Sequence, residues 1–107
     1  MTLRQRLPNR RASLTFEIAS QGLQFTCSAS WFADGSAAEV FLQNYKAGSM
    51  AGINAQDSAV VCSLCLQHGV PLETIRRALM RDARGAASGL LGVALDMIAQ
   101  TDGGAPC

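Results

Sequence analysis

The sequence has few of the groups on which most enzymes depend. His68 is the only histidine, and no serine elbow or recognisable pair of carboxylates accompanies it. A catalytic base works only beside a positioned nucleophile or acid, so these absences argue against acid–base and nucleophilic catalysis. The sequence thus shows no catalytic centre, and His68, just before Gly69, is expected to favour the end of its helix electrostatically.

Long apolar runs are absent as well. No stretch approaches the roughly 20 residues needed to span a bilayer. The basic start, MTLRQRLPNRR, lacks the apolar segment of a signal peptide. We therefore expect a cytoplasmic protein with no membrane partner, whose cysteines are reduced.

Charged residues are scarce, at 16% of the chain, whereas 49% of the residues are hydrophobic. This balance predicts a folded chain rather than a disordered one, and 107 residues suffice for one modest core. We predict a flexible basic arm over residues 1–10, a single domain over residues 11–100 and a flexible, glycine-rich tail over residues 101–107.

Alternating apolar and polar residues predict three strands. The alternation runs through residues 12–19, through residues 23–31 and through the segment around Val40. Asp34-Gly35 is typical of a two-residue hairpin turn. The three strands should form an antiparallel meander with one apolar face, which needs a cover of helices.

The longest of three predicted helices covers residues 54–68, with Asn54 as its N-cap. It is apolar around most of its circumference, and Gln56, Ser63 and Gln67 are expected to form its wet side. That breadth predicts burial between the sheet and the remaining helices.

Two shorter helices are expected after Gly69. The first covers residues 71–80 and opens with Pro71, and the second is capped by Ser88 and runs to about Gln100. The resulting fold class is α+β: a three-stranded antiparallel β-meander covered on one face by three helices, in the order β-β-β-α-α-α.

The segments AEVFLQNYKAGS and LQHGVPLETIRRAL, separated by an apolar helix, resemble the TSCPD domain. That domain lies at the C-terminal end of cobalamin-dependent ribonucleotide reductases and also forms small stand-alone proteins. The motif that names the family falls at Ser88–Leu91, where only Ser88 matches. Met50 stands where a cysteine is common in the family.

The resemblance implies a role in ribonucleotide reduction, and so in deoxyribonucleotide synthesis and DNA replication. The radical chemistry of the reductase needs a large barrel with several redox cysteines, which a chain of this size cannot contain. We therefore expect an accessory or regulatory module without its own catalytic centre, which binds a reductase subunit or a nucleotide. Cobalamin is implied by family association alone, and no cofactor is expected in this chain.

The glycine-rich KAGSMAG segment is the strongest candidate for an anion site. Lys46, Gly48, Ser49 and Asn54 would surround a helix N-terminus, where free amides favour anions or the phosphates of a nucleotide. The spacing matches neither a Walker loop nor a dinucleotide fingerprint.

Arginines form two groups, and Lys46 is the only lysine. One group lies in the N-terminal arm. The other contains Arg76, Arg77, Arg81 and Arg84, which would dock a partner protein, phosphates or nucleic acid if it is not simply a solvated face. Aromatic residues do not interleave with these arginines, which argues against a stacking platform for single strands.

Cys62 and Cys65 form a CxxC motif, which with His68 gives a third alternative, a small zinc or thiol protein. The motif lies inside an apolar helix rather than at a helix N-terminus, and zinc needs about four ligands, so core packing is the favoured interpretation. A homodimer through the sheet edge or the outer helix face is left open by the sequence.

Overall fold

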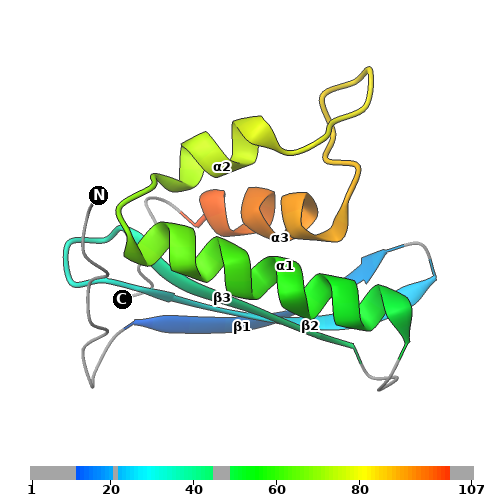
Figure 1. Cartoon of the computed structure of the whole chain (residues 1–107), viewed down its shortest axis with the longest axis horizontal. Helices are drawn as coiled ribbons and strands as arrows, with labels where there is room; N and C mark the ends of the chain where they lie inside the picture. The colour runs from blue at the N-terminus through cyan, green and yellow to red at the C-terminus, as the bar shows by residue number, and fades with distance from the viewer. Residues whose placement is uncertain (1–11, 21, 45–48, 102–107) are drawn as a thin grey trace.

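The structure, a computed structural model, describes residues 12–20, 22–44 and 49–101. The elements follow the predicted order: β1 (Ser13–Ser20), β2 (Leu23–Trp31), β3 (Ala37–Asn44), α1 (Met50–Gln67), α2 (Leu72–Ala78) and α3 (Leu90–Ala99). The strands form one antiparallel sheet in the order β1-β2-β3, and Figure 1 shows all three helices on the same face of it. The predicted α+β class is confirmed.

The two hairpins of the sheet differ in length. Ser20 lies opposite Leu23, so the first turn has two residues, with Gly22 at a φ of 77°. In the second, the Gly35 N–H donates to the carbonyl of Phe32 over 3.0 Å, and Gly35 has a φ of 90°. This turn is therefore one residue longer than the predicted Asp34-Gly35 hairpin, because the left-handed residue follows a type I turn.

The core lies between the apolar face of the sheet and the inner sides of α1 and α3. Cys27 and Val40 from the sheet and Leu95 from α3 are fully buried. Trp31 and Phe32 are buried too, at 1% and 5% exposure, so neither forms a contact patch beside the turn. Alternation alone was enough to predict which side of each strand packs inward.

Helix α1 begins four residues earlier than predicted. Its N-cap is Ser49, whose Oγ accepts hydrogen bonds from the Gly52 N–H over 3.0 Å and from Asn44 Nδ2 over 3.2 Å. Asn54 lies exposed in the second turn, so the predicted Asn54 cap is wrong. Ser49 takes this role because the end of β3 brings Asn44 beside it, a contact that no local pattern reveals.

The predicted wet side of α1 is wrong for two of its three residues, since Gln56 is exposed as expected but Ser63 and Gln67 are not. Ser63 and Gln67 are buried, and both bond to the backbone of edge strand β3. Ser63 Oγ accepts from the Val40 N–H and donates to the Val40 carbonyl, each over 2.9 Å, while Gln67 Nε2 donates to the Ala38 carbonyl over 3.0 Å. Backbone groups at a buried sheet edge need such partners.

The opposite error concerns the apolar residues of α1 that were expected to be buried. Ile53, Val60, Val61 and Leu64 are 43%, 50%, 60% and 40% exposed. They lie on the side of the helix turned away from Ala55, Ala59, Cys62 and Leu66, the small and apolar residues that reach the core. The helix is thus packed on one side only, because α2 and α3 leave this flank open.

Helices α2 and α3 are shorter than predicted. Ser88 does not cap α3, because Gly89 is the N-cap and the Ser88 N–H donates to the carbonyl of Met80 over 2.9 Å. That bond and the bridge between Arg81 and Ala87 close a short hairpin over residues 80–88. The connection between α2 and α3 is therefore a hydrogen-bonded hairpin.

Candidate functional site: an arginine–aspartate cluster

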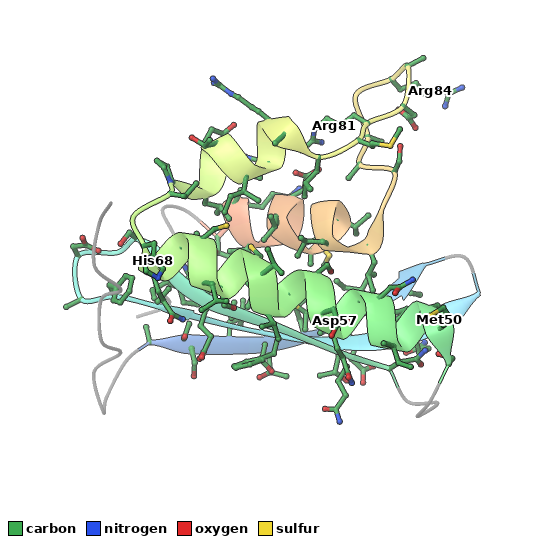
Figure 2. The ribbon with its side chains drawn as sticks, in the orientation of Figure 1. Met50, Asp57, His68, Arg81 and Arg84 are labelled. Atoms are coloured by element: carbon green, nitrogen blue, oxygen red, sulfur yellow. The ribbon has the colours of Figure 1, made fainter. Side chains whose placement is uncertain are left out.

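Three elements bring charged side chains together beside α2. Arg76 comes from α2, Arg81 from the base of the 80–88 hairpin and Asp96 from α3. Pro71 opens α2 with an extended backbone, and Glu73 lies in its first turn, where a negative charge favours the helix dipole. Figure 2 shows Arg81 at the base of the hairpin, close to α2 and above α3.

Asp96 is the centre of this cluster. Arg81 forms a bidentate pair with it: Nη1 donates to Oδ2 over 2.8 Å and Nη2 donates to Oδ1 over 2.7 Å. Arg76 adds a bond from Nε to Oδ1 over 2.9 Å and reaches Glu73 with Nη1 over 2.7 Å. A bidentate arginine–carboxylate pair is among the stronger and more directional ionic contacts in proteins.

Arg81 also binds backbone. Its Nη1 donates to the Gly85 carbonyl over 3.0 Å and its Nη2 to the Arg76 carbonyl over 3.3 Å. One guanidinium therefore ties together the hairpin, the end of α2 and α3. This arrangement holds the tertiary structure together at the place where sequence predicts a site for phosphates or a partner.

The cluster shifts the pKa of its carboxylate. Hydrogen bonds from Arg81 are the largest cause of the shift. Desolvation opposes them and hydrogen bonds from Arg76 add to them, and the pKa of Asp96 is lowered to about 2. The pKa of each arginine is raised, chiefly by its hydrogen bond to Asp96. All three side chains are about a quarter exposed, so the cluster stays charged at neutral pH at the surface of the molecule.

Arg77 and Arg84 do not join Arg76 and Arg81. The side chain of Arg77 is 81% exposed and lies 3.8 Å from Glu73. Arg84 lies at the far tip of the hairpin, as Figure 2 shows. Asp82 Oδ1 shapes that tip by accepting from the Arg84 and Ala86 N–H groups over 2.9 and 3.0 Å. The predicted group of four is therefore divided into two engaged and two exposed arginines.

The predicted anion site lies partly outside the described residues, which exclude Lys46 and Gly48. Of its other members, Ser49 Oγ is engaged in capping α1, and Asn54 lies exposed one turn into the helix. An anion at this helix end would meet the backbone amides around Ser49 rather than the Asn54 side chain, so the site remains a prediction.

The thiols of the CxxC motif are not equivalent. Cys62 is buried, which raises its pKa to about 11, and Cys65 is only partly buried. Cys27 is buried near Cys62 with a pKa raised to about 12, again chiefly by burial. Both buried thiols are therefore protonated at neutral pH, which makes them poor nucleophiles. His68 is the C-cap of α1, where its N–H donates to the carbonyl of Leu64 over 3.0 Å.

Within residues 12–20, 22–44 and 49–101, no group of three or more His, Cys, Asp or Glu side chains is placed to hold a metal ion. In the same part of the chain, no helix is both long and apolar enough to cross a membrane.

Asp96 is the residue of this cluster that sequence reasoning missed. It is the only charged residue of α3, in the segment LLGVALDMIA, and this isolation was the available signal. A lone carboxylate beside an apolar stripe needs a counter-ion, and two arginines lie 15 and 20 residues earlier.

An apolar surface pocket of about 340 Å³ lies next to the cluster. The hairpin contributes Met80 and Ser88, and the start of α3 contributes Leu91 and Gly92. Ser88–Leu91, where the motif that names the TSCPD family was expected to fall, thus borders this pocket.

The fold and the cluster together define a small α+β domain. The ion pairs of the cluster connect α2, the 80–88 hairpin and α3 of the same domain. A profile of the TSCPD domain family matches residues 2–101, and the chain belongs to that family. This confirms the resemblance seen in the sequence.

Two curated relatives carry the same name, vitamin B12-dependent ribonucleotide reductase. The one from Agrobacterium fabrum is 36% identical over 70 residues, which cover 65% of this chain and 6% of that protein. The one from Rhodopirellula baltica is 35% identical over 72 residues, 67% of this chain and 7% of that protein. The chain thus spans less than a tenth of the length of these relatives. No solved structure matches.

Proposed function

We propose that this chain is a TSCPD module associated with ribonucleotide reduction, which acts by binding a reductase polypeptide and has no catalytic centre of its own. The observation that carries the proposal is the family match over residues 2–101. It is combined with two reductase relatives in which the matching segment makes up 6–7% of the length of the protein. What the chain shares with the relatives is one small domain, which fits a binding or regulatory role.

The exposed flank of α1 is the surface that we assign to the reductase. Ile53, Val60, Val61 and Leu64 form an apolar stripe that the remaining elements leave uncovered. Asp57 is exposed on the same side of α1, one turn from both Ile53 and Val61, so the stripe surrounds one charge. Apolar residues gathered on one exposed face are typical of protein contacts. In the relatives the domain is covalently part of the reductase, which makes a reductase surface the natural cover for the stripe.

The experiment uses a B12-dependent reductase, such as that of Agrobacterium fabrum, with and without the segment that matches this chain. We expect the purified chain to bind the shortened reductase and to bind the intact one more weakly, because the intact protein fills the position with its own domain. Surface plasmon resonance measures both affinities. Equal binding to both proteins, or to neither, would contradict the proposal.

Two variants localise the contact. Val60→Asp should weaken binding at least tenfold, because it introduces a charge into the apolar stripe. Thr74→Asp introduces the same charge at an exposed position of α2, away from the stripe, and binding should be retained. Circular dichroism establishes that both variants are folded.

Anion or nucleotide binding is the second candidate, and the exposure of Arg77 and Arg84 favours it. Calorimetry with ADP at low and high salt tests it, with the expectation of salt-sensitive binding that weakens in Arg77→Ala and Arg84→Ala. The same assay with Arg84→Lys separates charge from the shape of the guanidinium. Binding that survives both alanine variants would exclude this surface.

A further inference from the structure

The two edge strands of the sheet differ in whether another element covers their outward backbone groups. The outer edge of β3 is covered by α1, whose Ser63 and Gln67 bond to its backbone. The other edge strand, β1, has no strand beyond it in the described part of the chain. An uncovered edge presents a row of N–H and C=O groups ready to pair with another strand.

The register shows which groups of β1 point outward. Ser20 faces Leu23 across a two-residue turn, and the Trp31 N–H donates to the Ala12 carbonyl over 3.0 Å. In an antiparallel ladder these bonds fall on alternate residues, so the even-numbered residues of β1 bond to β2. The N–H and C=O groups of Ser13, Thr15, Glu17 and Ala19 therefore face outward.

Strand β1 lacks most of the features that keep an edge unpaired. It is eight residues long, SLTFEIAS, without proline or lysine, and its register with β2 is unbroken by a bulge. On its inner face Leu14 and Phe16 pack against the core but are only partly buried. A strand placed alongside would complete their cover.

We propose that β1 is a dimerisation edge, at which a second copy of this chain pairs antiparallel to give a continuous six-stranded sheet. We choose a self-complementary register about a two-fold axis in which Phe16 faces Phe16 of the second copy. Leu14 then faces Ile18, which lines up the apolar face, and Glu17 faces Thr15. A shift by two residues toward the strand's end would instead oppose the two Glu17 side chains, which is unfavourable.

Sedimentation velocity of the whole chain over a range of concentrations tests the proposal. We expect a concentration-dependent dimer, and deuterium exchange should show the amides of Thr15 and Ala19 becoming protected as the dimer forms. Thr15→Pro removes an outward N–H that β2 does not use, so it should give a folded monomer. Monomers of the wild-type chain at every concentration, or a dimer unchanged in Thr15→Pro, would overturn the proposal.

Two substitutions of opposite charge at position 15 test the register. Comparing them with each other separates an effect on the dimer from a general loss of folding. Thr15→Lys and Thr15→Glu lose the same 3.3 Å contact with Ser28 Oγ. In the dimer each new charge faces Glu17 of the other copy, and the two-fold axis makes this contact occur twice. Thr15→Lys should tighten the dimer and Thr15→Glu should weaken it, each by roughly 2- to 30-fold in dissociation constant. A dimer that responds alike to both substitutions would exclude this register and the β1 interface.

Discussion

At the scale of single residues, partners supplied by distant parts of the chain set the role of each polar group. Asp96 has two arginines around it, and Ser63 has both backbone groups of Val40. In each case one side chain satisfies several groups at once, so its removal leaves more than one partner unmatched.

Replacing Asp96 by Asn should lower stability in a pH-dependent way. The folded-state pKa of Asp96 is about 2, below the ordinary value of 3.8 for an aspartate, so its stabilising contribution is present above about pH 4 and is lost as the pH falls through 2. At pH 7 we expect a loss of about 1–2 kcal/mol at this partly exposed site. Urea unfolding from pH 7 to pH 2 measures it.

The two unfolding curves should converge at acid pH. Near pH 2 the wild-type chain has lost much of the contribution that Asp96→Asn lacks throughout. Asp57→Asn removes a carboxylate from α1 and leaves the cluster intact, so it reports the effect of net charge alone. A constant difference between Asp96→Asn and wild type across this pH range would contradict the assigned pKa.

Ser63→Ala should destabilise the fold by about 1–3 kcal/mol, because the buried Val40 N–H and C=O each lose a hydrogen bond. Thermal unfolding measures the loss, and the Val40 amide should exchange faster with deuterium. Ser58→Ala is the control on the same helix, since its hydroxyl bonds only to the local Ala55 carbonyl, over 2.8 Å. Similar effects at both sites would show that the bonds to β3 contribute nothing particular.

At the scale of elements, packing depends on how closely they approach. The 80–88 hairpin lies so close to α3 that a Cβ on Gly92 would come within 2.8 Å of the Ala87 Cβ. Together with the Arg81–Asp96 pair, this contact holds the hairpin against the helix. A side chain at position 92 would push the two apart and strain the ion pair.

Gly92→Ala should therefore cost about 1–3 kcal/mol through overpacking, although alanine favours helix. Gly89→Ser is the matched control three residues earlier, where a Cβ has nothing within 4 Å and a hydroxyl would supply the missing N-cap acceptor. Chemical denaturation should show opposite signs for the two variants. A neutral Gly92→Ala would mean that the hairpin moves away without loss.

At the scale of the whole molecule, one sheet face carries the core, and none of the helices in the described residues lies on the opposite face (Figure 1). The buried thiols report on opening of this single core, since Cys27 comes from the middle strand and Cys62 from α1. A reagent reaches either sulfur only when the sheet and α1 separate.

Thiol labelling of the native chain should accordingly show Cys65 modified well before Cys62 and Cys27. Burial raises the pKa of the latter two to about 11 and 12, which keeps them protonated as well as covered. Mass spectrometry of labelled peptides over time measures the order, and urea should abolish the difference. Rapid labelling of Cys62 in the native state would point instead to a reactive CxxC motif.

Alternation and turn residues determined the strands, the apolar face and the element order by themselves, because these depend on neighbours within a few residues. The tertiary structure decided the rest. The sequence pattern placed Ser63 and Gln67 on the solvent-exposed side of the helix, but they form hydrogen bonds with the edge of β3. Ser49 rather than Asn54 caps α1, because Asn44 lies beside Ser49. Asp96 was paired with arginines far along the chain. Polar side chains take their roles from the groups that folding places next to them, and a local pattern does not contain those groups.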